Sequence, residues 1–174
     1  MAMSVTTRFV QIDVYTASYR VVGKARISSS GLIGLLNDDT TSYLRLYDAT
    51  LARLHAPTKL AARYKSVELT KRGIHAVCAT AREDMCPLGV VHSGFSRVSQ
   101  YQVVAISQVF EFSGEFNWSG RFDPAVILVE GTHDFLAFYD GTLRAVLFPN
   151  LRVKAPSMLV NRRKIDIFTR MEDK

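Results

Sequence analysis

The sequence predicts a mainly β protein: two small β-barrel or roll units in tandem, each with five or six antiparallel strands and one short helix. Three observations lead to this prediction. Apolar and polar residues alternate with a period of two, as at Val10, Ile12 and Val14. Residues 43–51 recur as 135–143 with five identities. Short antiparallel strands expose their edges unless a sheet closes, which favours barrels over open ribbons.

The repeat extends to both sides of this segment, so we interpret it as a tandem duplication. Residues 19–28 match 110–119 in an aromatic start, a central glycine and a final serine. Residues 71–77 match 162–168, and the offset stays between 91 and 92. We predict a first unit over 8–82, a connector over 83–96 and a homologous second unit over 97–171. Pro87, Gly89 and Gly94 are typical of a connector.

In the first unit, local patterns predict the elements in chain order. The expected strands are rich in Val, Tyr, Leu and Ile and are separated by turn-like breaks. They lie near 10–14, 19–27, 43–47, 49–55, 66–70 and 74–80. A short helix is expected over 30–37, opened by Ser30. Asp48-Ala49 aligns with Asp140-Gly141, a dipeptide common in tight turns, so a turn is expected at both places.

The second unit is expected to repeat this order. Residues 125–129 are mostly β-branched, which favours a strand by propensity. Asp123 and Pro124 before them, however, are typical of a helix N-cap followed by proline in the first turn. We therefore expect a short helix here as well. The aromatic residues of this unit are expected to fill its core: Phe110, Phe112, Phe116, Trp118 and Phe122.

Length and composition set outer limits on function. The 174 residues are 48% hydrophobic and 22% charged, as in ordinary globular proteins and unlike disordered chains. The N-terminal residues contain no apolar signal-peptide core, and the longest apolar run, 125–129, is far too short to span a bilayer. Two cysteines are too few for a disulfide framework. We therefore expect a cytoplasmic protein without membrane partners.

Several segments together resemble a known type of domain. They are the glycine-containing strand at 19–27, Gly-Leu-Ile-Gly-Leu-Leu-Asn-Asp at 31–38, Tyr-Leu-Arg-Leu-Tyr-Asp-Ala at 43–49 and Lys-Arg-Gly-Ile-His-Ala-Val at 71–77. This pattern resembles an uncharacterised bacterial β-domain family of unknown function, here present as a tandem duplication. The resemblance implies a fold and no activity.

A fainter likeness is to Sm-like small barrels. These share a bent strand with a glycine and a late basic-Gly-apolar strand similar to Lys71-Arg72-Gly73-Ile74. The likeness implies that the corresponding loop contacts RNA. The short helix departs from the Sm-like pattern, and so does Lys164, which stands where the first unit has Gly73.

The cysteines and histidines form a weak candidate for a metal site. His75, Cys78, Cys86 and His92 are of the types that zinc prefers. His75 and Cys78 lie three residues apart on an expected strand and so point to opposite faces. We therefore expect no metal, and we interpret Cys78 as a core thiol.

No sequence motif for nucleophilic, phosphate-binding or dinucleotide-binding chemistry is found. Paired acids can act in glycoside chemistry, but Asp38, Asp39 and Asp48 fall near a helix end and a turn, where aspartate is favoured because it bonds the backbone. We interpret them as structural turn residues. The sequence thus predicts no catalytic residue and no cofactor.

Positive charge is concentrated in the first half of the chain. Residues 1–87 carry twelve Lys or Arg against seven Asp or Glu, whereas residues 88–174 carry ten against nine. Both units still have a basic edge around their late strands, where a polyanion could be neutralised. The candidate polyanion-binding residues are Lys71, Arg72, Arg162, Arg163 and Lys164.

Two functional hypotheses follow. The first is a non-enzymatic binding or interaction module, in a regulatory role, that associates with itself or with a protein partner. The alternative is a nucleic-acid (RNA) binder that uses the basic strand edges. Basic residues on strand edges also keep β proteins soluble and block edge-to-edge pairing, so the sequence favours the first hypothesis.

Overall fold

Ten antiparallel strands dominate the computed structural model, which describes residues 6–86 and 98–172. The strands of the first half are β1 (Arg8–Thr16), β2 (Tyr19–Ile27), β3 (Tyr43–Arg53), β4 (Leu60–Thr70) and β5 (Ile74–Ala79). The strands of the second half are β6 (Val98–Ser107), β7 (Phe110–Ser119), β8 (Phe135–Ala145), β9 (Arg152–Asn161) and β10 (Ile165–Arg170). The prediction of a mainly β protein is confirmed.

Short helical segments connect the strands at matching places in the two halves. The helix α1 (Gly31–Leu36) precedes β3, and a wide helical turn, η3 (Val126–Glu130), precedes β8. Both helical segments were predicted from sequence. Asp123 caps the second one as expected, because its Oδ1 accepts a hydrogen bond from the Ala125 N–H at 2.9 Å. Among the described residues, none of the helical segments is long and apolar enough to cross a membrane.

Three single turns of 3-10 helix complete the connections. The segment η1 (Lys71–Gly73) links β4 to β5, and η4 (Arg162–Lys164) links β9 to β10. The third, η2 (Arg82–Asp84), follows β5. Both η1 and η4 carry the basic residues that the sequence marks as candidates, so these residues lie on tight turns between strands that follow one another in the chain but do not pair in the sheet.

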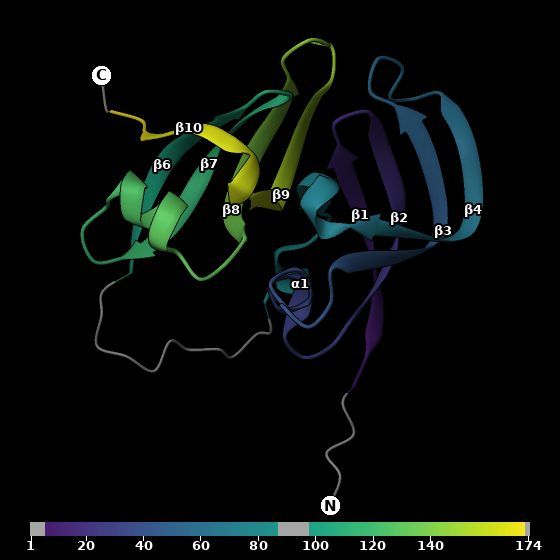
Figure 1. Cartoon of the computed structure of the whole chain (residues 1–174), viewed down its shortest axis with the longest axis horizontal. Coiled ribbons are helices and arrows are strands. Elements are labelled where there is room, and N and C mark those ends of the chain that lie inside the picture. The colour runs from purple at the N-terminus through teal and green to yellow at the C-terminus, as the bar shows by residue number, and fades with distance from the viewer. Residues whose placement is uncertain (1–5, 87–97, 173–174) are drawn as a thin grey trace, which may run out of the picture.

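All ten strands belong to one sheet, in the order β10-β6-β7-β8-β9-β5-β1-β2-β3-β4. Among the described strands the sheet has two free ends, β10 and β4, which lie in the left and right parts of Figure 1. The sheet does not close, so strand pairing does not confirm the two separate barrels that the sequence predicted. The five strands of each half are contiguous, and β5 pairs with β9 where the halves meet.

The strand register repeats between the halves with the offset seen in the sequence. Val14 pairs with Val77 between β1 and β5, and Ala105 pairs with Phe168 between β6 and β10, 91 residues later in both strands. Both strand pairs also have a register irregularity at their far end. The two halves are therefore built with the same pairing.

β3 and β8 each continue as one strand past the positions where tight turns were expected, so that prediction is wrong. Each is a single strand of 11 residues with a register shift against its neighbour. Asp48 and Asp140 sit at these bulges with φ of 50° and 44°, a conformation that aspartate tolerates better than most residues. Gly114 faces the second bulge, where a Cβ would lie 2.9 Å from the Tyr139 carbonyl oxygen. The dipeptide bends the strand and does not end it.

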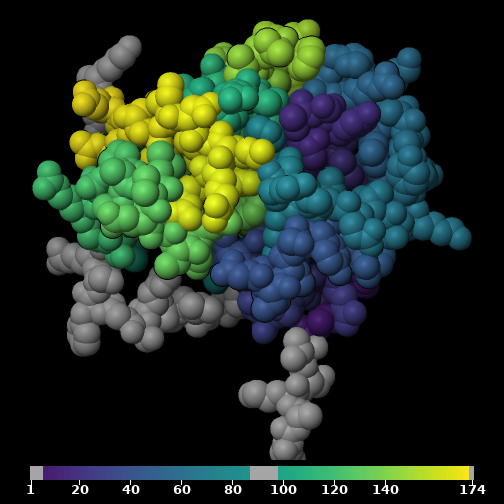
Figure 2. Space-filling model, viewed as in Figure 1, coloured from purple at the N-terminus to yellow at the C-terminus, as the bar shows by residue number. Residues whose placement is uncertain are grey.

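Two apolar clusters form the core, and each includes residues from the other half. Tyr15 and Ala76 pack into the cluster of the second half, and Phe135 and Leu159 pack into that of the first. Figure 2 shows the two halves, purple to teal and green to yellow, in broad contact. The predicted aromatic core of the second half is confirmed, with some members buried and others partly buried: Phe110, Phe112, Phe116, Trp118 and Phe122.

The start of the expected connector belongs to the folded body. Met85 is fully buried in the first half's core, and its carbonyl oxygen accepts a hydrogen bond from the Ile33 N–H at 3.0 Å. Buried Asp84 forms an ion pair with Arg8 at 2.6 Å. These contacts fix the chain after β5 against α1 and the start of β1. The rest of the connector, with Pro87, Gly89 and Gly94, lies outside the described residues.

Candidate functional site in the cleft between the two halves

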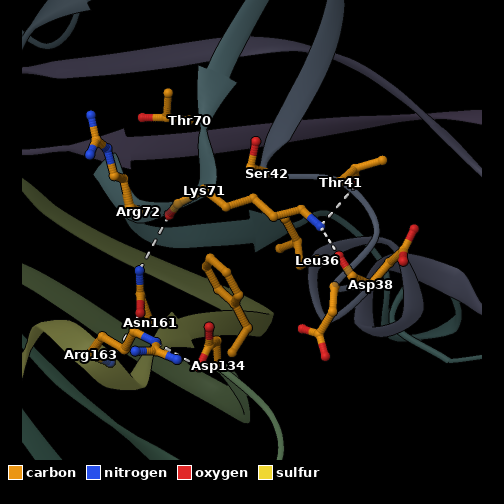
Figure 3. A pocket seen from close by; sticks show the side chains of 12 residues that line it. Leu36, Asp38, Thr41, Ser42, Thr70, Lys71, Arg72, Asp134, Asn161 and Arg163 are labelled. Carbon is orange, nitrogen blue, oxygen red and sulfur yellow. Dashed lines mark hydrogen bonds and ion pairs between the residues drawn. The ribbon is translucent and has the colours of Figure 1, made fainter.

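A cleft of about 590 Å³ lies at the boundary between the halves (Figure 3). Its walls come from the loop after α1, from η1 and from the ends of β8 and β9, so residues of both halves line it. The lining residues are Leu36, Asp38, Asp39, Thr41, Ser42, Thr70, Lys71, Arg72, Asp134, Phe135, Asn161 and Arg163.

The apolar floor of the cleft is held by a bridge between the halves. Leu36 and Phe135 are both buried. Asn37, which ends α1, donates from Nδ2 to the Phe135 carbonyl oxygen at 3.1 Å and accepts from the Phe135 N–H at 2.8 Å. One side chain thus satisfies both backbone groups of Phe135, as a neighbouring strand would. The floor is therefore built in and does not depend on a ligand.

The side chain of Lys71 forms hydrogen bonds within the first half. Its Nζ donates to the Asp38 carbonyl oxygen at 2.7 Å and to Thr41 Oγ1 at 3.2 Å. Partial burial lowers the pKa of Lys71, although the nearby charges of Asp38 and Asp39 oppose this shift. The ammonium group holds the loop at 38–42 against η1 while it faces the cleft.

Arg162 and Arg163 converge on a single carboxylate in the second half. Asp134 Oδ1 accepts from Arg163 Nε at 2.9 Å and from Arg162 Nη2 at 3.3 Å. Burial alone would raise the pKa of Asp134, but the hydrogen bonds from these two guanidinium groups outweigh burial and lower it. Asp134 therefore stays ionised and neutralises part of the predicted basic edge.

Lys71 and Arg162 play equivalent parts, 91 residues apart. The Lys71 N–H donates to the Ser42 carbonyl oxygen at 2.9 Å, and the Arg162 N–H donates to the Asp134 carbonyl oxygen at 2.7 Å. In both halves the charged side chain of the first residue of the 3-10 turn donates a hydrogen bond to the loop that precedes the third strand. These two candidate residues thus have structural partners.

The remaining candidates separate into two places. Arg72 is exposed at the cleft and forms no ion pair with the described residues. Lys164 does not line the cleft. Its charge adds to burial in lowering the pKa of His75. The structure therefore brings together Lys71, Arg72 and Arg163 in the cleft, and leaves Arg162 and Lys164 outside its lining.

Three carboxylates in the cleft were missed as site residues. Asp38 is a turn residue, as expected, because its Oδ1 accepts from the Thr40 N–H at 2.9 Å and from Thr40 Oγ1 at 2.7 Å. These two bonds lower the pKa of Asp38. Exposed Asp39 lies beside it, and Asp134 comes from the other half. The sequence signal was present in the Asp38-Asp39 pair, but nothing in it placed Asp134 opposite.

Asn161 forms the inner wall and was also missed. It is buried, its Nδ2 donates to the Ile74 carbonyl oxygen at 2.8 Å, and its Oδ1 accepts from the Arg163 N–H at 3.0 Å. The side chain therefore ties η4 of the second half to the start of β5 in the first. The corresponding residue of the first half is Thr70, so the sequence repeat gave no reason to single out this position.

The candidate metal residues do not come together. His75 is buried with its ring 5.5 Å from the Phe110 ring centroid, and Cys78 is a buried core thiol as expected. Burial raises the pKa of the Cys78 thiol to about 12. His92 lies outside the described residues. Within 6–86 and 98–172, no group of three or more His, Cys, Asp or Glu side chains could hold a metal ion.

A scan against protein-family models and searches among curated proteins and solved structures find no match to this chain. The resemblance to bacterial β-domains and the fainter likeness to Sm-like barrels therefore stay predictions.

Proposed function

We propose that this protein is a non-enzymatic binding module whose cleft holds a ligand with both positive and negative groups, namely a mixed-charge segment of a partner protein. The observation that carries the proposal is the arrangement of charge over an apolar floor. Figure 3 shows Arg72 and Arg163 on one side of the cleft, and Asp38 on the other. Opposite charges at separate places select a ligand with the complementary pattern.

The state of the ionisable groups supports binding over catalysis. Asp38 and Asp134 have lowered pKa values, so at neutral pH both are carboxylates that have no proton to donate and are weaker bases than an ordinary aspartate. Lys71 already donates to two oxygen atoms. The cleft thus offers fixed charges and hydrogen-bonding groups, which suit recognition. The same carboxylates would repel a uniformly anionic ligand.

Nuclear magnetic resonance titration tests this proposal. The probes are a peptide of alternating Lys and Glu and a polyglutamate peptide of equal length. We expect the alternating peptide to shift the amide signals of residues 38–42, 71–73 and 161–163. Arg72→Gln and Asp39→Asn are each expected to weaken binding about tenfold, the loss of roughly one charged hydrogen bond. Arg152→Gln, exposed on β9 outside the cleft, serves as the matched control.

Two results would contradict the proposal. One is tighter binding of polyglutamate than of the alternating peptide, because the cleft would then act as a polyanion site. The other is the absence of shifts in the cleft with either peptide. Equal effects of Arg152→Gln and Arg72→Gln would likewise show that binding depends on overall charge and not on the cleft.

One observation favours the alternative, RNA binding at a basic strand edge. On β4 the exposed cations Arg63 and Lys65 flank Tyr64, whose side chain is 50% exposed. Neither cation forms an ion pair within the described part of the chain. An aromatic ring between two cations can stack on a base while the cations contact phosphates. This surface is separate from most of the residues that the sequence marked.

Fluorescence anisotropy with labelled mixed-sequence single-stranded RNA decides between the two. An RNA binder loses affinity steeply as salt rises, and Tyr64→Ala would weaken it whereas Tyr43→Ala, at another exposed tyrosine, would not. Charge reversal at Lys71 and Arg72 tests whether η1 contributes to RNA binding. A lack of RNA binding even at low salt removes the alternative and leaves the mixed-charge proposal in place.

We also propose that the chain is a tandem duplication, with units over 8–82 and 97–171. The same order of strands and helical segments in both halves supports it, as do strand pairs displaced by 91 residues. The positive φ at both Asp48 and Asp140 is a further shared feature. Two independent sequences have no physical reason to place the same rare conformation at the same bulge.

A further inference from the structure

The seam between β5 and β9 shows how one half covers an edge strand of the other. Ala76, Val77, Cys78 and Ala79 pair with Val160, Leu159, Met158 and Ser157. All six residues of β5 are buried, because alternate side chains pack into the two core clusters, and the strand is also paired on both sides. An exposed edge strand with such apolar residues is a template for pairing with another strand.

Each half contains one strand of the β5 type and one of the β9 type, but within the chain only β5 and β9 pair in this way. β10 pairs with β6 as β5 pairs with β1, and β4 pairs with β3 as β9 pairs with β8. By the offset of 91 residues, β10 is the counterpart of β5, and β4 is the counterpart of β9. Within residues 6–86 and 98–172, β10 and β4 are the two free ends of the sheet. The two free edge strands are therefore the counterparts of the two strands that pair at the seam.

Side-chain exposure at the two free ends agrees with this interpretation. Ile167 on β10 is 55% exposed, whereas its counterpart Ala76 is fully buried at the seam. Leu60 on β4 is 56% exposed, whereas its counterpart Leu151 is 5% exposed. Tyr19 is the counterpart of Phe110, which packs on Tyr15 and His75 of the other half, and Tyr19 is 38% exposed. Apolar side chains thus remain in water where their counterparts are covered.

We propose that β10 of one copy pairs antiparallel with β4 of a second copy and continues the sheet from chain to chain. The register follows from the seam by the offset of 91: Ile167 faces Leu69, Phe168 faces Glu68, Thr169 faces Val67, and Arg170 faces Ser66. The contact is head to tail, so each chain keeps one free β4 and one free β10 for further copies until a ring closes. This proposal does not depend on what the cleft binds.

The charged residues of β4 are compatible with this pairing. Lysine and arginine on an edge strand discourage pairing, and β4 carries Arg63 and Lys65. Their counterparts on β9, Lys154 and Pro156, lie before the segment that pairs with β5. Arg63 and Lys65 therefore fall outside the segment, 66–69, that receives β10.

One oppositely charged pair gives the contact its specificity. In the proposed register Arg170 lies diagonally across from Glu68 on the same face of the sheet. Their counterparts Ala79 and Leu159 lie in one core cluster at the seam, and long side chains at such diagonal positions are within reach of each other. Glu68 already pairs with Arg45 at 2.9 Å, but both side chains are about half exposed, and such pairs are weakly held.

Charge reversal with a compensating swap tests the proposal on the full chain. Sedimentation velocity over a wide concentration range measures the mass of the wild type, of Glu68→Arg, of Arg170→Glu and of the double variant. We expect the wild type to form assemblies above the 19.5 kDa chain, each single variant to shift toward the monomer, and the double variant to regain assembly. Exposed Glu130→Arg and Arg152→Glu are the charge-matched controls.

Each outcome of the sedimentation experiment either supports or overturns head-to-tail pairing. A single discrete multiple of the chain mass indicates a closed ring, and a growing distribution indicates an open filament; both support head-to-tail pairing. A monomer at every concentration overturns the proposal. An assembly that both single variants leave intact overturns it as well, because the contact would then lie elsewhere. Single variants that weaken assembly without recovery in the double variant contradict the register.

Discussion

Asn161 joins the two halves at the inner wall of the cleft. Its Nδ2 donates to the Ile74 carbonyl oxygen, and its Oδ1 accepts from the Arg163 N–H. Asn161→Ala leaves the buried Ile74 carbonyl and the partly buried Arg163 N–H without this partner, so the free energy of unfolding is expected to fall by about 2 kcal/mol. Urea denaturation measures the change, and exposed Asn150→Ala is the control. Similar values for the two variants would show that the bridge does not stabilise the boundary.

His75 makes stability depend on pH below neutrality. Burial, with a smaller contribution from the charge of Lys164, lowers the pKa of His75 to about 4, from about 6.5 in an unfolded chain. As pH falls through this window the unfolded chain gains a proton that the folded chain does not accept. Stability therefore decreases from pH 6.5 toward 4, by at most about 1.4 kcal/mol per pH unit from this group.

The variant His75→Phe isolates this contribution, because phenylalanine has no charge at any pH. The urea midpoint is expected to fall with pH more steeply for the wild type than for His75→Phe between pH 6.5 and 4. The variant at exposed His133, His133→Gln, is expected to keep the pH dependence of the wild type. Carboxylates titrate in both proteins and cancel in the comparison. Parallel slopes for His75→Phe and the wild type would mean that His75 is protonated in the folded state.

Residue types predicted only part of the site. Lys71, Arg72 and Arg163 were identified as basic residues near the late strands, and the structure gathers them in one cleft. The sequence did not indicate that Asp134 neutralises Arg162 and Arg163. These arginines lie 28 and 29 residues further along the chain, on another element. A candidate site inferred from charge alone misses its counter-charges when these come from another element.

At the scale of the elements, periodicity and the repeat predicted most of the strands and both helical segments. They failed at Asp48 and Asp140, where the dipeptide resembles a turn. A turn and a bulge both need a residue that tolerates positive φ, so the local sequence does not separate them. The deciding feature is on the neighbouring strand, where Gly23 and Gly114 leave room for the bulge.

Gly114→Ala tests that explanation of the bulge. An added Cβ would lie 2.9 Å from the Tyr139 carbonyl oxygen and 3.0 Å from the Gly141 Cα, both of them backbone atoms. The strand would have to shift, and the expected loss is about 2 kcal/mol of unfolding free energy. Gly73→Ala meets only the Thr70 hydroxyl at 3.1 Å and is the matched control. Equal melting temperatures for the two variants would contradict the steric role of Gly114.

At the scale of the whole molecule, the shared core predicts that the halves unfold together. Met158 of β9 is fully buried beside Cys78 of β5. Met158→Ala is expected to cost about 3 kcal/mol and to lower the temperature of a single calorimetric transition. Met171→Ala, at an exposed methionine, leaves it in place. Two separate transitions, only one of which responds to Met158→Ala, would show that the halves fold independently.

The pairing of β5 with β9 places the cleft between the halves and defines the two free ends of the sheet. Amide hydrogen exchange measures this pairing most directly, at a dilution where the chain is a monomer. Amides of residues 76–79 are expected to exchange only through global unfolding, because β5 has a strand on each side, whereas outward amides of β4 exchange orders of magnitude faster. Exchange at 76–79 as fast as at the free edge of β4 would contradict the continuous sheet.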